Sequence, residues 1–198
     1  MFTITSLHVR TGPLLAAFLL LTLLACRDQG SRKKEPEIVR IDKLTGPGFS
    51  MKVPEGYVHR PDILKELGQP DAKAVWQEKP GDYPNPFLGS LVVVPVGPLP
   101  GKAAEETIKY LDDPENCVKE FEAIPLQKTT RISEGLPPGV VCQVRGEVRG
   151  GDQQAVILTL MKQPGKNSAW VLTCNHDPRD VNGPSACAKA LEGWEFIP

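Results

Sequence analysis

Short stretches of this chain follow the hydrophobic pattern of β-strands. Residues 49–53 alternate apolar and polar side chains, which is the period of a strand with one buried face, and Ala72, Ala74 and Trp76 suggest a second strand. Residues 91–94 (Leu-Val-Val-Val) do not alternate and are rich in β-branched side chains. This last stretch predicts a central strand that is covered on both faces.

The last third of the chain predicts an antiparallel meander. Residues 128–132 and 140–148 flank a Leu-Pro-Pro-Gly turn, and residues 153–161 and 169–175 flank a Pro-Gly-Lys-Asn turn. Gly and Pro in such short connections are typical of hairpins.

Other stretches have helical spacing. Pro61 opens a short predicted helix that ends at Gly68, and Asp112-Asp113-Pro114 separates two more helices. A final helix is expected to end at Gly193. The predicted buried faces are Ala104, Ile108 and Leu111, then Cys117, Val118 and Phe121, and finally Cys187, Ala190, Leu191 and Trp194. Strands and helices in this order predict one α+β domain, an antiparallel β-sheet covered by a few helices.

The amino-terminal region has a different pattern. Residues 14–25 contain one polar side chain, Thr22, and this run of 12 residues is too short to cross a bilayer, which needs roughly 20. Its length, the basic Arg10 before it and the small Ala25 at its end are typical of a signal peptide over residues 1–25.

The stretch Leu23-Leu24-Ala25-Cys26 resembles the lipobox of bacterial lipoproteins. The resemblance implies that Cys26 carries a diacylglycerol, becomes the first residue after cleavage, and is acylated on its amino group. The protein would then be held at a membrane by acyl chains. An ordinary cleaved signal peptide with an incidental cysteine, or an uncleaved apolar anchor, remains the alternative.

The charge of the chain bears on its partners, and the composition of its amino-terminal part bears on where the globular domain begins. The net charge is −1, and removal of residues 1–25 takes away Arg10 alone and leaves −2. This balance gives no reason to expect nucleic acid as a partner. Residues 26–46 begin with a charged segment and are interpreted as the lipidated amino terminus and a flexible tether, and residues 47–198 as the globular domain.

With Cys26 assigned to lipid, four cysteines remain, an even number in an exported chain, and two disulfides are expected. Three pairings are possible. Cys174 with Cys187 is favoured, because a strand end and the start of the next helix meet across a short connection, and Cys117 with Cys142 then follows. A metal-binding or reactive thiol is disfavoured because the chain has no Cys-x-x-Cys.

Candidate chemistry gathers in one short segment. Cys174, His176, Asp177 and Asp180 lie close in sequence and suggest a thiol nucleophile or a metal site. A cysteine in a disulfide serves neither role, and the composition of residues 175–184 predicts a surface loop. The sequence therefore predicts no catalytic residue, no metal and no cofactor, although a hydrolase with a site built from scattered residues is kept as the alternative.

Residues 49–57 (Phe-Ser-Met-Lys-Val-Pro-Glu-Gly-Tyr) and the element order up to residue 198 resemble the PsbP-like fold. The resemblance implies an assembly or interaction module, since members of that family serve mostly in such roles. We therefore expect a lipid-anchored, periplasm-facing envelope protein that binds an unidentified envelope protein. Arg27 departs from the aspartate that retains enterobacterial lipoproteins at the inner membrane, which favours the outer membrane.

Overall fold

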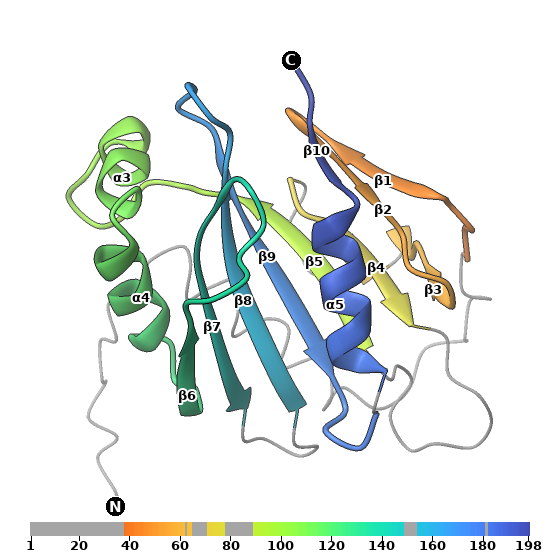
Figure 1. The fold of residues 1–198 in the computed structure, drawn as a ribbon. Coiled ribbons are helices and arrows are strands. Elements are labelled where there is room, and N and C mark those ends of the chain that lie inside the picture. The colour runs from red at the N-terminus through yellow and green to blue at the C-terminus, as the bar shows by residue number, and fades with distance from the viewer. Residues whose placement is uncertain (1–37, 62, 65–70, 78–88, 149–153, 181) are drawn as a thin grey trace, which may run out of the picture.

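The computed structural model describes residues 38–198 except 62, 65–70, 78–88, 149–153 and 181. The larger of two sheets in the described chain is a seven-stranded antiparallel sheet with the strand order β3-β4-β5-β9-β8-β7-β6 (Figure 1). Its strands are β3 (Tyr57–Val58), β4 (Lys73–Gln77), β5 (Gly89–Pro95), β6 (Gln127–Ile132), β7 (Val140–Val148), β8 (Gln154–Lys162) and β9 (Ala169–His176). The predicted strands and hairpins of the last third are confirmed.

A second, three-stranded sheet has the order β1-β2-β10. It consists of β1 (Lys43–Gly46), β2 (Phe49–Lys52) and β10 (Trp194–Phe196), so the last strand of the chain pairs with one of the first (Figure 1). Both sheets are antiparallel, and the helices lie outside them. The α+β class expected from the sequence is therefore confirmed.

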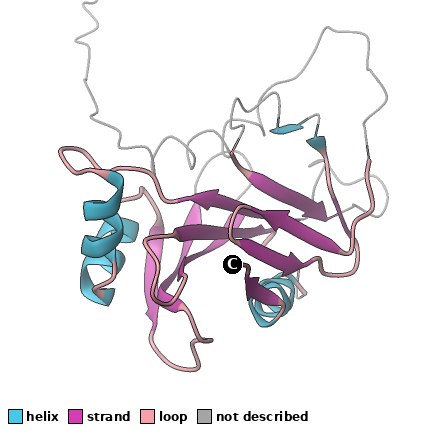
Figure 2. Cartoon of the chain, turned by 90° about the horizontal axis from the view of Figure 1, so that it is seen from above, coloured by secondary structure: helices cyan, strands magenta, loops and turns pink. Residues whose placement is uncertain are grey.

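The helices cover opposite faces of the large sheet. Helices α3 (Ala104–Leu111) and α4 (Pro114–Glu122) pack on one face, and α5 (Gly183–Glu192) lies on the other, together with the small sheet (Figures 1 and 2). In β9, Trp170, Leu172 and Cys174 face α5, while Ala169 and Val171 face α4. The strand is buried along its whole length, because both of its faces are covered.

Local sequence signals explain where α4 begins. The Asp113 side chain accepts a hydrogen bond from the Glu115 amide at 2.9 Å and so caps α4, with Pro114 in the first turn.

The buried face of α3 differs in one residue from the prediction. Ala104 is exposed, and Thr107 is buried instead, where its hydroxyl oxygen accepts a hydrogen bond from the Leu99 amide at 2.9 Å.

Two short strands were missed by the sequence analysis. Residues 43–46 form β1, although they were assigned to the tether, and Leu44 is buried. Trp194 was placed on the last helix, but α5 ends at Gly193, as expected, and Trp194 begins β10. Both strands are short, and each is defined by its pairing with β2, which lies far from β10 in sequence.

Parts of two predictions fall on undescribed residues. Residues 79–86, which hold three prolines and a glycine and are therefore predicted from the sequence to form a loop, lie outside the described residues, and so does most of the expected helix from Pro61 to Gly68. Ile63 is described and packs against Ala74, Trp76 and Val92. Among the described residues, no helix is long and apolar enough to cross a membrane.

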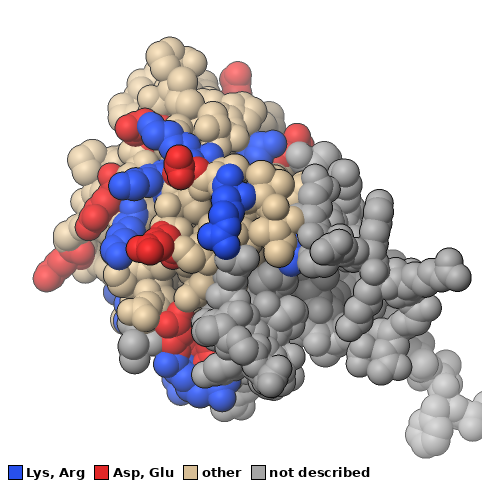
Figure 3. All heavy atoms as spheres, turned by 90° about the vertical axis from the view of Figure 1, so that its right-hand side faces the viewer, with Lys and Arg blue, Asp and Glu red and all other residues tan. Residues whose placement is uncertain are grey.

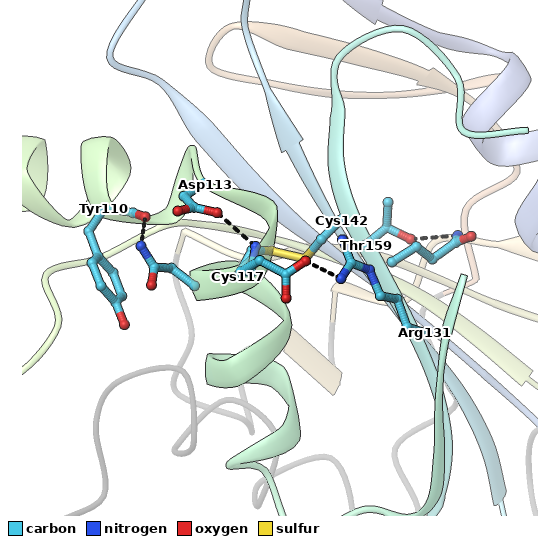
Figure 4. The surroundings of a disulfide bond; sticks show 9 residues. Tyr110, Asp113, Cys117, Arg131, Cys142 and Thr159 are labelled. Atoms are coloured by element: carbon cyan, nitrogen blue, oxygen red, sulfur yellow. Dashed lines mark hydrogen bonds and ion pairs between the residues drawn. A yellow bond between two sulfur atoms is a disulfide. The ribbon is translucent and has the colours of Figure 1, made fainter. Parts of the chain in front are cut away.

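Two disulfides connect helices to the large sheet, one on each face. Cys117 of α4 is bonded to Cys142 of β7 (Figure 4), and Cys174 of β9 is bonded to Cys187 of α5. All four cysteines are buried. This is the pairing that the sequence analysis favoured.

The disulfides are expected to contribute strongly to stability. The bonded cysteines are 25 residues apart for Cys117–Cys142 and 13 for Cys174–Cys187, which corresponds to about 3.5 and about 3 kcal/mol in the loop-entropy account. Replacing either pair by alanine should lower the free energy of unfolding by roughly these amounts or more, since buried sulfur atoms are also lost. Urea titration followed by circular dichroism measures the change. A loss below about 1 kcal/mol for either pair would contradict this account.

Candidate functional site

Polar side chains meet at the end of the large sheet where β4 and β9 end and β5 begins. Tyr57 pairs with Gln77, and Gly89 pairs with His176. Trp76 pairs with Ser90, so Gln77 and Gly89 are also neighbours in register. We call Tyr57, Gln77, Gly89 and His176 the polar row.

The hydroxyl of Tyr57 lies inside the protein. Tyr57 is buried and donates a long hydrogen bond, 3.4 Å, to Oε1 of Gln77. Burial raises the pKa of Tyr57, and the negative charge of Asp180 raises it further.

Because residue 89 is a glycine, the side chains of Tyr57 and Gln77 can approach the backbone of β5 closely. A Cβ atom at residue 89 would lie 2.8 Å from the Asn175 carbonyl oxygen, 3.1 Å from the Tyr57 hydroxyl and 3.2 Å from Oε1 of Gln77. A larger residue would have to displace these groups. Glycine thus lets two side-chain oxygen atoms lie directly over the start of β5.

His176 is the last residue of β9 and is 7% exposed. Its Nδ1 lies 3.0 Å from the Asp177 carbonyl oxygen, and because a carbonyl only accepts, this bond places the proton on Nδ1. The first turn of α5 packs tightly on the imidazole: a Cβ at Gly183 would lie 2.3 Å from Cγ of His176. The predicted surface loop is wrong for Asn175 and His176, because both pair with β5 and β8 and are buried.

Asp177 is held by Arg179. The Arg179 amide and Nε donate to Oδ1 of Asp177 at 2.8 and 2.9 Å, and Nη2 donates to Oδ2 at 2.5 Å. These hydrogen bonds lower the pKa of Asp177 to about 2. The charge of this carboxylate is thus compensated within its own loop.

Only one of the two carboxylate oxygens of Asp180 has a hydrogen-bond partner. Its Oδ1 accepts a hydrogen bond from the Asn182 amide at 3.0 Å, whereas its Oδ2 is buried and has no hydrogen-bond partner. The indole Nε1 of Trp194 is the only other such atom among the described residues. That nitrogen belongs to an aromatic cluster away from the polar row, where Trp194 stacks on Phe49 with ring centroids 4.7 Å apart.

The sequence candidates are only partly brought together. The sulfur of Cys174 is engaged in the disulfide with Cys187, and Asp177 is bound to Arg179. In the described part of the chain, no three His, Cys, Asp or Glu residues are placed to hold a metal ion. Cys26, the candidate lipidation residue, lies outside the described residues.

Tyr57, Gln77 and Gly89 were not identified as site residues from the sequence. Their proximity to His176 depends on the pairing of β3, β4, β5 and β9, which no local pattern specifies. The one sequence signal is a glycine at the start of an otherwise β-branched strand, which is typical of a close approach to the backbone.

Other buried polar side chains form hydrogen bonds with one another. On the opposite face of β9, Asn175 donates to the Ser90 hydroxyl at 3.1 Å. Between β7 and β8, Gln143 donates to Thr159 at 2.9 Å. At the surface, basic and acidic side chains are interspersed on the described part of the face in Figure 3. Lys43 and Glu195 form an exposed ion pair, with their charged atoms 3.2 Å apart.

No protein-family model matches the chain, and no curated protein sequence matches it. Among solved structures, it is similar to LpqN, a protein involved in cell envelope biogenesis of Mycobacterium tuberculosis, with 15% identity over 83% of this chain and 93% of LpqN and a TM-score of 0.48. It is also similar to the Ran-binding protein Mog1p of Saccharomyces cerevisiae, with 10% identity over 83% of this chain and 97% of Mog1p and a TM-score of 0.46.

A third similar structure is a protein of Bacteroides thetaiotaomicron VPI-5482, with 11% identity over 78% of this chain and a TM-score of 0.48. This chain spans about half, 47%, of the Bacteroides protein. Likeness at this level assigns neither a family nor a function, and the resemblance to PsbP-like proteins stays a prediction.

The Asp177–Arg179 interaction predicts an acid-sensitive loop. The lowered pKa means that the stabilisation is present above the unfolded pKa of 3.8 and is lost as the pH falls toward about 2. Carbon-13 NMR of the Asp177 carboxyl group should give a midpoint near 2, and Arg179→Gln should return it toward 3.8. Because Arg179 is exposed, the loss of stability should stay within about 1 kcal/mol. A midpoint that does not respond to Arg179→Gln would contradict this assignment.

Proposed function

We propose that the protein is a bacterial envelope lipoprotein, anchored through acyl chains on Cys26. The observation that carries this proposal is the Leu-Leu-Ala-Cys stretch at the end of an apolar run that is too short to span a bilayer. More than one acyl chain on the same residue gives stable membrane attachment, because each buried methylene adds about 0.8 kcal/mol. The folded domain then faces the periplasm, and Arg27 favours the outer membrane.

The two disulfides support an exported location. Disulfides persist in oxidising compartments such as the periplasm and are rare in the cytosol. Both join buried cysteines of a helix and a strand, as expected of structural bonds. They leave Cys26 as the one cysteine of the chain outside a disulfide, which agrees with a separate role for this residue.

The folded domain is proposed to act by binding, as an interaction or assembly module for another envelope protein. The hydrolase alternative would need an activated nucleophile. The cysteine that the sequence offered for this role, Cys174, has its sulfur in a disulfide and is not available as a thiolate. Near Cys174 lie the buried His176 and the carboxylate of Asp180, one of whose oxygens has no hydrogen-bond partner. Such groups fit the recognition of a ligand as well as they fit catalysis.

Lipidation can be tested directly. Intact-mass spectrometry of the membrane fraction should show a chain that begins at Cys26 and carries acyl chains. Cys26→Ala should leave an uncleaved precursor without the lipid mass. The control Cys117→Ala/Cys142→Ala removes two cysteines of the domain and should still be lipidated. A processed, unlipidated wild-type chain would contradict the anchor and favour an ordinary signal peptide.

Binding by the domain can be separated from the anchor. In one strain, the full lipoprotein is cross-linked in the envelope and extracted with detergent; in another, a soluble exported chain without residues 1–26 is treated in the same way. If the domain carries the interaction, the same cross-linked envelope protein should be recovered with both forms. Recovery with the lipidated form alone would contradict a binding role of the domain.

A further inference from the structure

We draw no further inference here: the strongest candidate, the outer edge of the large sheet at β6, whose residues 128–131 are exposed and which pairs only with β7 in the described part of the chain, carries no proposal because nothing in the structure shows what covers it.

Discussion

Burial of β9 on both faces is the constraint on which the rest of the structure depends. All eight of its residues are buried, and it pairs with β5 on one side and β8 on the other. An antiparallel strand in this position needs a layer on each face. Helices α3 and α4 supply one layer, and α5 and the small sheet supply the other.

The two disulfides reinforce this three-layer arrangement. Each joins a helix to a strand of the large sheet, and they lie on opposite faces. On the α5 side, the small sheet is attached through aromatic side chains: Trp170 of β9 contacts Phe49, Trp194 and Phe196, with ring centroids 5.8 to 6.2 Å apart. These contacts bring the two ends of the described chain together beside β9.

The polar row is the exception to this apolar packing. It lies where the strands end, and the first turn of α5 packs on His176 there. Tyr57 and His176 are buried there, and one carboxylate oxygen of Asp180, in the loop after β9, is buried without a hydrogen-bond partner. Unsatisfied polar groups in an otherwise well-packed domain are more readily explained by a ligand than by stability.

The sequence by itself determined the elements whose signals are local. Residues 91–94 predict a central strand because β-branched residues without alternation need cover on both faces, and Asp113-Pro114 marks the start of α4 through capping and a fixed backbone angle. The spacing of Cys174 and Cys187 also indicated their pairing.

Only the tertiary structure decided the remainder. Strands β1 and β10 are too short to carry a pattern and exist because β2 pairs with them, and His176 is buried because two neighbouring strands extend past it. Tyr57 lies near Gly89 for the same reason: their proximity is set by the register of β3, β4 and β5, and a local sequence pattern does not encode contacts between residues so far apart.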